Sequence, residues 1–167
     1  MIGNDVIDII QSRHESNWQR KGFIQKLFTA NEQLMISNAP DPEIMVWLFW
    51  SMKEAAYKIY NRQTKRREYI PKKLLCSVVS QDNDYIIGKV NCAQNIYHTK
   101  TILSQESIHT LAVNYLDDLK NVIEIENKGI FKDNNGIPYL YNFLSNTFQD
   151  VSISHHGRFE KVVTLDI

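Results

Sequence analysis

The sequence is poor in the residues that mark several large classes of protein. Its 167 residues include only two cysteines and six glycines. Cys76 and Cys92 each lie in an apolar, strand-like run, at a spacing that matches no zinc site, so both are expected to be reduced core residues. The glycines are too few and too scattered for a Walker loop or a dinucleotide-binding turn.

An excess of one charge and long apolar runs are also missing. Nineteen basic residues balance nineteen acidic ones, so no global field attracts the chain to nucleic acid or to anionic lipid. No apolar run approaches a membrane span, and the first residues show no basic leader followed by an apolar block. These absences predict a soluble, cytoplasmic protein of one domain, residues 1–167, with a core of its own.

The periodicity along the chain predicts an α+β fold, in which an antiparallel sheet packs on a long central helix. Thr29 and Glu32 form a capping box that begins one helix, and Asp41 followed by proline begins the central helix. Helices are expected over residues 14–27, over 30–37, from 42 to about 60 and over 140–146. Strands are expected over residues 2–10, 74–80, 85–91, 95–104, 108–115, 150–154 and 160–167, with a tight turn at 133–136.

The helix from residue 42 to about 60 carries the most informative polar pair. Glu54 and Lys58 are one turn apart and share a face with Trp47, Trp50 and Ser51. One interpretation is an ordinary surface pair on a solvated face. The alternative is that this face lines a cleft, which the two tryptophans favour because large aromatic side chains usually contact other groups.

Two further polar segments interrupt apolar structure. Asp5 lies in the first strand, where a carboxylate either faces solvent or serves a site. Ser154 and His155 end a late strand, which is either a simple turn or a cluster of ligand-binding groups. Two carboxylates, Asp5 and Glu54, suit Mg²⁺, which leaves its other positions to water and phosphate. Lysine and histidine nearby suit the phosphates.

The order of these segments resembles the 4′-phosphopantetheinyl transferases. Residues 3–9 resemble the opening motif of that superfamily, and residues 28–32 resemble the following segment of its short, holo-acyl-carrier-protein-synthase type. Residues 50–58 look like the second motif, residues 136–140 like the Gly-x-Pro stretch, and residues 151–155 like the Ser-Ile-Ser-His segment. Asn4 and His156 depart from the usual residues. Residues 70–126 match no motif and look like an inserted or extended β element.

The resemblance implies a reaction and roles for five residues. The enzyme would transfer 4′-phosphopantetheine from coenzyme A to a serine of an acyl or peptidyl carrier protein and release 3′,5′-ADP. Asp5 and Glu54 would hold Mg²⁺, and Glu54, or a metal-bound water beside it, would take the serine proton. Lys58 would contact a reacting phosphate, and Ser154 and His155 would bind coenzyme A phosphates.

The resemblance also implies how the chain assembles. One copy of the motif set, in the order of the short enzymes, implies that a second protomer completes the site, as in a trimer. The alternative is a monomer that builds the second wall of the site from residues 70–126.

Other functions stay open at this point. The basic cluster Lys65, Arg66, Arg67, Lys72 and Lys73 is a solvated loop, a surface that steers an acidic carrier protein, or a nucleic-acid patch. Zero net charge and the lack of interleaved aromatic residues disfavour the last. A non-catalytic module that binds coenzyme A or an acidic partner is the remaining alternative, although such a module would be expected to lose a metal carboxylate or the helix lysine.

Overall fold

The structure, a computed structural model, describes residues 1–143 and 145–166. Its elements in chain order are β1 (Ile2–Asp8), α1 (Ile9–Glu15), α2 (Phe23–Leu27), α3 (Ala30–Asn38), α4 (Pro42–Thr64), η1 (Pro71–Lys73), β2 (Leu75–Gln81), β3 (Ile86–Cys92), β4 (Asn95–Leu103), β5 (Ser107–Val113), η2 (Leu116–Asn121), β6 (Val122–Glu124), β7 (Ile130–Lys132), β8 (Pro138–Asn142), β9 (Thr147–His156) and β10 (Phe159–Leu165). This mixture of helices and antiparallel strands confirms the α+β class. In the described part of the chain, no helix is both long and apolar enough to cross a membrane.

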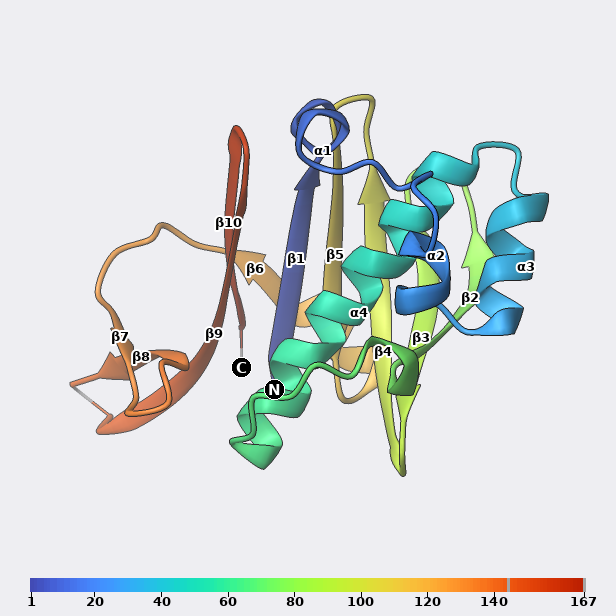
Figure 1. Ribbon diagram of the computed structural model, residues 1–167. Coiled ribbons are helices and arrows are strands. Elements are labelled where there is room, and N and C mark those ends of the chain that lie inside the picture. Colours follow the sequence, from blue (N-terminus) through green and yellow to red (C-terminus); the bar gives the residue numbers. More distant parts are fainter. Residues whose placement is uncertain (144, 167) are drawn as a thin grey trace.

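The first sheet has the strand order β1-β5-β4-β3-β2 and carries α4 across one face (Figure 1). As the sequence predicted, Pro42 begins α4 and Asp41 caps it by accepting a hydrogen bond from the amide of Ile44. The apolar side of the helix is buried in the main core, where Phe49 and Met52 are fully enclosed. Burial of this side against the sheet holds α4 in a fixed position relative to β1.

Gly3 explains how closely β1 and α4 approach each other. A Cβ atom at this position would overlap the backbone carbonyl oxygen of Ala55. Because glycine lacks that atom, β1 can lie directly against the turn of α4 that carries Glu54. Asp5 lies two residues further along β1 and so shares the strand face of Gly3, which brings its carboxyl group to the same side.

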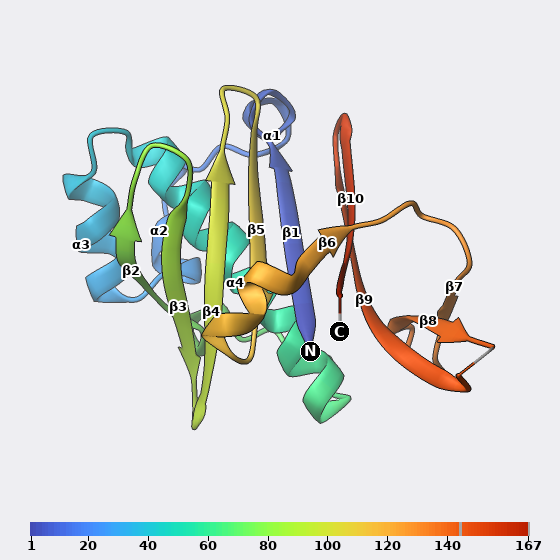
Figure 2. The same cartoon turned by 180° about the vertical axis from the view of Figure 1, so that it is seen from behind.

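The second sheet has the order β6-β10-β9-β8-β7 and stands beside β1 (Figure 1). In the view from behind, the segment that contains η2 and β6 crosses the face of the first sheet opposite α4 and leads the chain into the second sheet (Figure 2). A small apolar cluster joins the two sheets and consists of Ile2, Leu111, Val113, Val163 and Leu165. The late strands β9 and β10 therefore lie against the first strand of the chain.

Three of the predicted elements differ from the structure. The helix predicted over residues 14–27 is wrong between residues 16 and 22, since α1 ends at Glu15 and α2 spans only Phe23–Leu27. The predicted helix at 140–146 is wrong in the described part, since Pro138–Asn142 forms strand β8; residue 144 lies outside the described residues. Tyr139 and Tyr141 share one face of β8 and both pack on Phe148, so the period is that of a strand. The first strand ends at Asp8 rather than at residue 10, because the Asp8 carboxylate caps α1.

Candidate active site

Asp5 on β1 and Glu54 on α4 line the same cavity, whose volume is about 220 Å³. Trp47 and Trp50 form part of its wall, and His155 reaches it from β9. The face of α4 that carries both tryptophans and Glu54 therefore lines a cleft, and the interpretation of Glu54 as part of a solvated surface pair is wrong. Asp5 is likewise partly buried rather than freely solvated.

Burial disfavours the charged form of both carboxyl groups, and the charge of Asp5 adds to this effect at Glu54. Burial raises the pKa of Glu54 to about 7, and the negative charge of Asp5 adds to the shift while Lys58 opposes it. Burial also raises the pKa of Asp5, against the effects of Lys58 and of hydroxyl hydrogen bonds. A cation placed between the two carboxylates would offset both the burial and the mutual repulsion.

The donor set of this cavity fits Mg²⁺. Two carboxylates from rigid elements face a space large enough for water and phosphate oxygens, which is how proteins usually hold this ion. Among residues 1–143 and 145–166, no group of three or more histidine, cysteine, aspartate and glutamate side chains is arranged to bind a metal. Mg²⁺ usually keeps several water or phosphate oxygens, so Asp5 and Glu54 would hold it together with oxygens of that kind.

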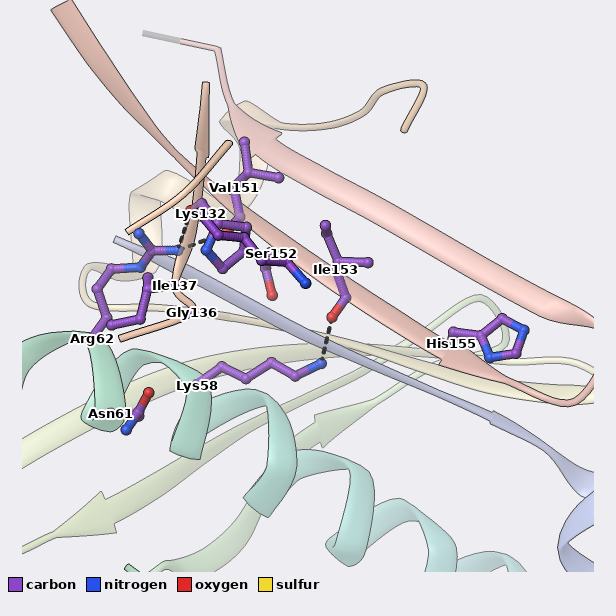
Figure 3. A pocket seen from close by; sticks show the side chains of 11 residues that line it. Lys58, Asn61, Arg62, Lys132, Gly136, Ile137, Val151, Ser152, Ile153 and His155 are labelled. Carbon is purple, nitrogen blue, oxygen red and sulfur yellow. Dashed lines mark hydrogen bonds between the residues drawn. The ribbon is translucent and has the colours of Figure 1, made fainter. Parts of the chain in front are cut away.

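Lys58 bridges the two sheets next to these carboxylates. Its ammonium donates to the carbonyl oxygen of Asn4 on β1 at 2.6 Å. It also donates to the carbonyl oxygen of Ile153 on β9 at 2.9 Å (Figure 3). Burial lowers the pKa of Lys58, while Asp5 and Glu54 oppose the shift. An ammonium has three N–H groups, so one remains available to a ligand oxygen after both carbonyl bonds are made.

Ser154 and His155 come to the site from β9 but face different groups. The Ser154 hydroxyl accepts a hydrogen bond from the amide of Val6 at 2.9 Å and donates to Asp5 Oδ1 at 3.1 Å. The side chain of His155 is exposed and lines the carboxylate cavity. All five residues predicted for the site thus gather around one place, although Ser154 is turned toward Asp5.

A second cavity, of about 380 Å³, adjoins the first and is basic. Its charged or titratable wall consists of Lys58, Arg62, Lys132 and His155 (Figure 3). Because His155 lines both cavities, the basic cavity and the carboxylate cavity meet at this residue. An elongated anion could therefore extend from the cationic cavity toward Asp5 and Glu54.

The sequence interpretation missed Arg62 and Lys132. Arg62 donates to Asp150 Oδ1 at 2.9 Å and to the carbonyl oxygens of Pro138 and Val151 at 3.0 and 2.6 Å, which ties the end of α4 to the second sheet. Glu54, Lys58 and Arg62 follow one another at intervals of four residues, so the helix period could have indicated Arg62. Lys132 lies in a short strand with no comparable signal.

The basic cluster after α4 divides into two parts. Lys65 pairs with Asp133 at 3.1 Å, and Arg67 donates to the carbonyl oxygen of Asn135 at 2.8 Å, so these residues hold the turn at 133–136. Lys72 and Lys73 instead line a separate surface cavity of about 310 Å³ together with Lys26 and Tyr69. Among the described residues of the cluster, Lys65 is held in an ion pair and Arg67 by a backbone carbonyl, whereas Arg66, Lys72 and Lys73 form no ion pair.

Comparison with known families agrees with this geometry. The family model of the 4′-phosphopantetheinyl transferase superfamily matches residues 1–112, which include β1, α4 and the strands of the first sheet nearly to the end of β5. The chain therefore belongs to the 4′-phosphopantetheinyl transferase superfamily, and it is a transferase by that membership. No curated protein gives a significant match to the chain.

Proposed function

We propose that the protein transfers 4′-phosphopantetheine from coenzyme A to a serine hydroxyl of an apo carrier protein in the presence of Mg²⁺ and releases 3′,5′-ADP. The observation that carries the proposal is the meeting of Asp5, Glu54 and Lys58 with His155 where a carboxylate cavity joins a basic one. Superfamily membership supports phosphopantetheine transfer in general. The donor and the acceptor are proposed from that membership, and the metal from the two carboxylates of the first cavity.

The basic cavity is the proposed binding site of coenzyme A. Lys58 and Lys132 supply positive charge, while Arg62 lines the wall but is paired with Asp150. The volume of about 380 Å³ is typical of a small-molecule site. We place the nucleotide end of coenzyme A with its 3′-phosphate there, and the diphosphate beside His155 where the two cavities meet. This arrangement directs the phosphorus that bears the pantetheine arm toward Glu54.

The residues of the chain then have separate roles in the transfer. The carrier serine oxygen bonds to the phosphorus that bears pantetheine, while the bond from that phosphorus to the 3′,5′-ADP oxygen breaks. Glu54 accepts the serine proton, directly or through a water, because its carboxylate lines the cavity where the reacting phosphorus is placed. Lys58 donates its remaining N–H to a phosphate oxygen. Mg²⁺ held by Asp5 and Glu54 would supply positive charge that neutralises the diphosphate.

The carrier protein would approach over the surface formed by Lys26, Tyr69, Lys72 and Lys73. Carrier proteins are acidic, and this surface is adjacent to a small cavity that Tyr69 shares with Trp50 and Glu54. Positive charge there would steer the acidic partner toward the reacting serine. Lys65 and Arg67 contribute less because they are engaged by the turn at 133–136.

The decisive experiment incubates the protein with coenzyme A, Mg²⁺ and apo carrier proteins from fatty-acid, polyketide and pigment synthesis, and reads intact mass. We expect one of the carriers to gain the mass of one phosphopantetheine group, more slowly when Lys72 and Lys73 are both changed to glutamate. Binding of coenzyme A without a mass gain on any carrier would support the alternative, a non-catalytic binding module. If the variant with both lysines changed to glutamate modifies the carrier as fast as the wild type does, the proposed carrier surface is wrong.

A further inference from the structure

Strand β9 contacts the edge of β1 through alternate side chains rather than through its backbone. The amides of Asn4, Val6 and Asp8 donate to Ser152 Oγ, Ser154 Oγ and His156 Nδ1, each at 2.9 Å. Because side chains on a strand alternate between two faces, these three residues point toward β1, while the intervening residues face the other way. The Ser-Ile-Ser-His segment is thereby divided between the two sides of β9.

The hydrogen-bonding capacity of Ser154 is used within this ladder. A hydroxyl has one hydrogen to donate, and Ser154 directs it to Asp5 Oδ1 at 3.1 Å, while its oxygen accepts from Val6. An ionised carboxylate only accepts hydrogen bonds, so this contact is a donation by Ser154. Ser154 is also only 6% exposed. To bind a phosphate oxygen, Ser154 would have to withdraw its hydrogen from Asp5.

We propose that Ser154 is a positioning residue that fixes the orientation of the Asp5 carboxylate, and that it does not bind coenzyme A. This inference rests on the proposed function, because it assigns Asp5 to the metal and His155 to the coenzyme A phosphates. It replaces the role expected for Ser154 from the family resemblance. A group that orients a metal ligand through a hydrogen bond affects metal affinity strongly without touching the ion.

Ser152 provides a matched control on the same strand. It is 2% exposed, accepts from the amide of Asn4 at 2.9 Å and donates to Asn4 Oδ1 at 2.7 Å. Ser152 therefore bonds to β1 as Ser154 does, except that its hydroxyl donates to the side-chain amide of Asn4 and not to a carboxylate. Any effect that comes only from loosening the contact between β9 and β1 should appear in both serine variants.

The test measures the affinity of the whole protein for Mn²⁺, followed by electron paramagnetic resonance without coenzyme A. We expect Ser154→Ala to weaken Mn²⁺ binding by about tenfold, the lower end of the range for a partner of a metal ligand. Ser152→Ala should stay within about twofold of the wild type. In transfer assays at saturating Mg²⁺, Ser154→Ala should leave the KM for coenzyme A within about twofold.

Three outcomes would overturn the proposal. One is an unchanged Mn²⁺ affinity in Ser154→Ala, and another is a raised KM for coenzyme A at saturating Mg²⁺, which would place Ser154 on the phosphates. The third is an equal loss of Mn²⁺ affinity in both serine variants, which would indicate a shared structural effect. Because Mn²⁺ binding needs no turnover, the proposal can fail or hold separately from the proposed transfer reaction.

If Ser154→Ala does not fold, Ser154→Cys can be measured in its place. Ser154→Cys keeps nearly the same shape but replaces the hydroxyl with a thiol, which is a weak donor. We expect it to unfold near the wild-type temperature and to weaken Mn²⁺ binding in the same direction by a smaller factor. Wild-type Mn²⁺ affinity in a folded Ser154→Cys protein would count against the proposal.

Discussion

The ammonium of Lys53 lies 2.8 Å from Oε1 and 2.9 Å from Oε2 of Glu32, and both side chains are buried. Lys53 also donates to the carbonyl oxygens of Pro71 and Leu74, and Glu32 accepts from the amide of Cys76 at 2.8 Å. This ion pair joins α3, α4 and the entry to β2. Since Lys53 precedes Glu54 on α4, the pair also fixes the helix turn that carries Glu54, the carboxylate that we propose to be catalytic.

Removing one member of this ion pair should destabilise the fold. We expect Lys53→Met or Glu32→Gln to lower the free energy of unfolding by about 3–5 kcal/mol, because each leaves a buried group without its partner. The double variant Lys53→Met with Glu32→Gln should lose less than the sum of the two single losses, since it leaves no uncompensated charge. Urea unfolding monitored by tryptophan fluorescence measures all three. Strict additivity would show that the two groups do not depend on each other.

Replacing a carboxylate of the cavity should affect the reaction far more than the fold. Asp5→Asn and Glu54→Gln are each expected to reduce transfer by about two to four orders of magnitude, the scale for loss of a positioned acid–base or electrostatic group. Glu43→Gln is the control, because Glu43 lies on the same helix but pairs with Arg13 at the surface. Near-normal transfer by either cavity variant with Mg²⁺ present would contradict the metal assignment.

Lys58 and His155 should separate turnover from binding. Lys58→Met is expected to lower kcat, because the third N–H of Lys58 is assigned to a reacting phosphate. It should also lower the unfolding temperature, since the carbonyls of Asn4 and Ile153 lose their donor. His155→Ala is expected to raise the KM for coenzyme A with little change in kcat or stability. An unchanged KM in His155→Ala would remove this residue from the coenzyme A site.

The ion pair of Asp8 with Arg158 should make stability depend on pH in the acid range. Hydrogen bonds from the Arg158 side chain, with Arg158 Nε 2.8 Å from Asp8 Oδ2, hold the pKa of Asp8 well below its usual value of 3.8. Folding therefore favours the ionised carboxylate, and this contribution is complete above pH 3.8 and is lost as pH falls below it.

Asp8→Asn keeps the oxygen that caps α1 but removes this charge. We expect the difference in unfolding free energy between wild type and Asp8→Asn to be constant above about pH 5 and to shrink below about pH 4. Denaturant unfolding from about pH 2.5 to about pH 7, a range that spans the ordinary pKa of aspartate, tests this expectation. A difference that stays constant down to the lowest pH would show that Asp8 is not held ionised by the fold.

Local signals in the sequence were sufficient for most elements. The capping box of Thr29 and Glu32 and the start of α4 at Asp41 depend on residues close together in the chain, and both are present. The helix period also placed Glu54 and Lys58 on one face. The wrong helix at 140–146 arose where three aromatic residues lie close together, and their strand period became clear only through pairing with β9.

The contacts that complete the site connect residues far apart in the sequence. Glu32 was identified as a capping residue, but its second contact is with Lys53. Ser154 was identified by resemblance, but its bond to Asp5 depends on the register of two strands from different sheets. A shift of one residue in β9 would turn Ser154 away from β1, and no local pattern determines that register.

A site shared within a trimer and a site held by one monomer differ in which chain supplies the wall opposite α4. In this structure β9 brings His155 to the cavity of Asp5 and Glu54 within one chain, and Lys58 bonds β1 to β9 directly. The wall opposite α4 thus comes from β9, not from residues 70–126 as the monomer alternative supposed. We therefore expect a monomer to be active, with a specific activity that does not fall on dilution through the micromolar range.

Mixing two inactive or impaired variants gives the sharper test of this expectation. If Glu54 of one protomer works with His155 of a neighbour, Glu54→Gln mixed with His155→Ala assembles some intact sites and recovers transfer at low coenzyme A. If each chain holds its whole site, the mixture gives no more than the sum of its parts. Sedimentation with Mg²⁺ and coenzyme A shows which species is present in the assay. Recovery of activity in a sedimenting trimer would establish the shared site and exclude the self-contained monomer.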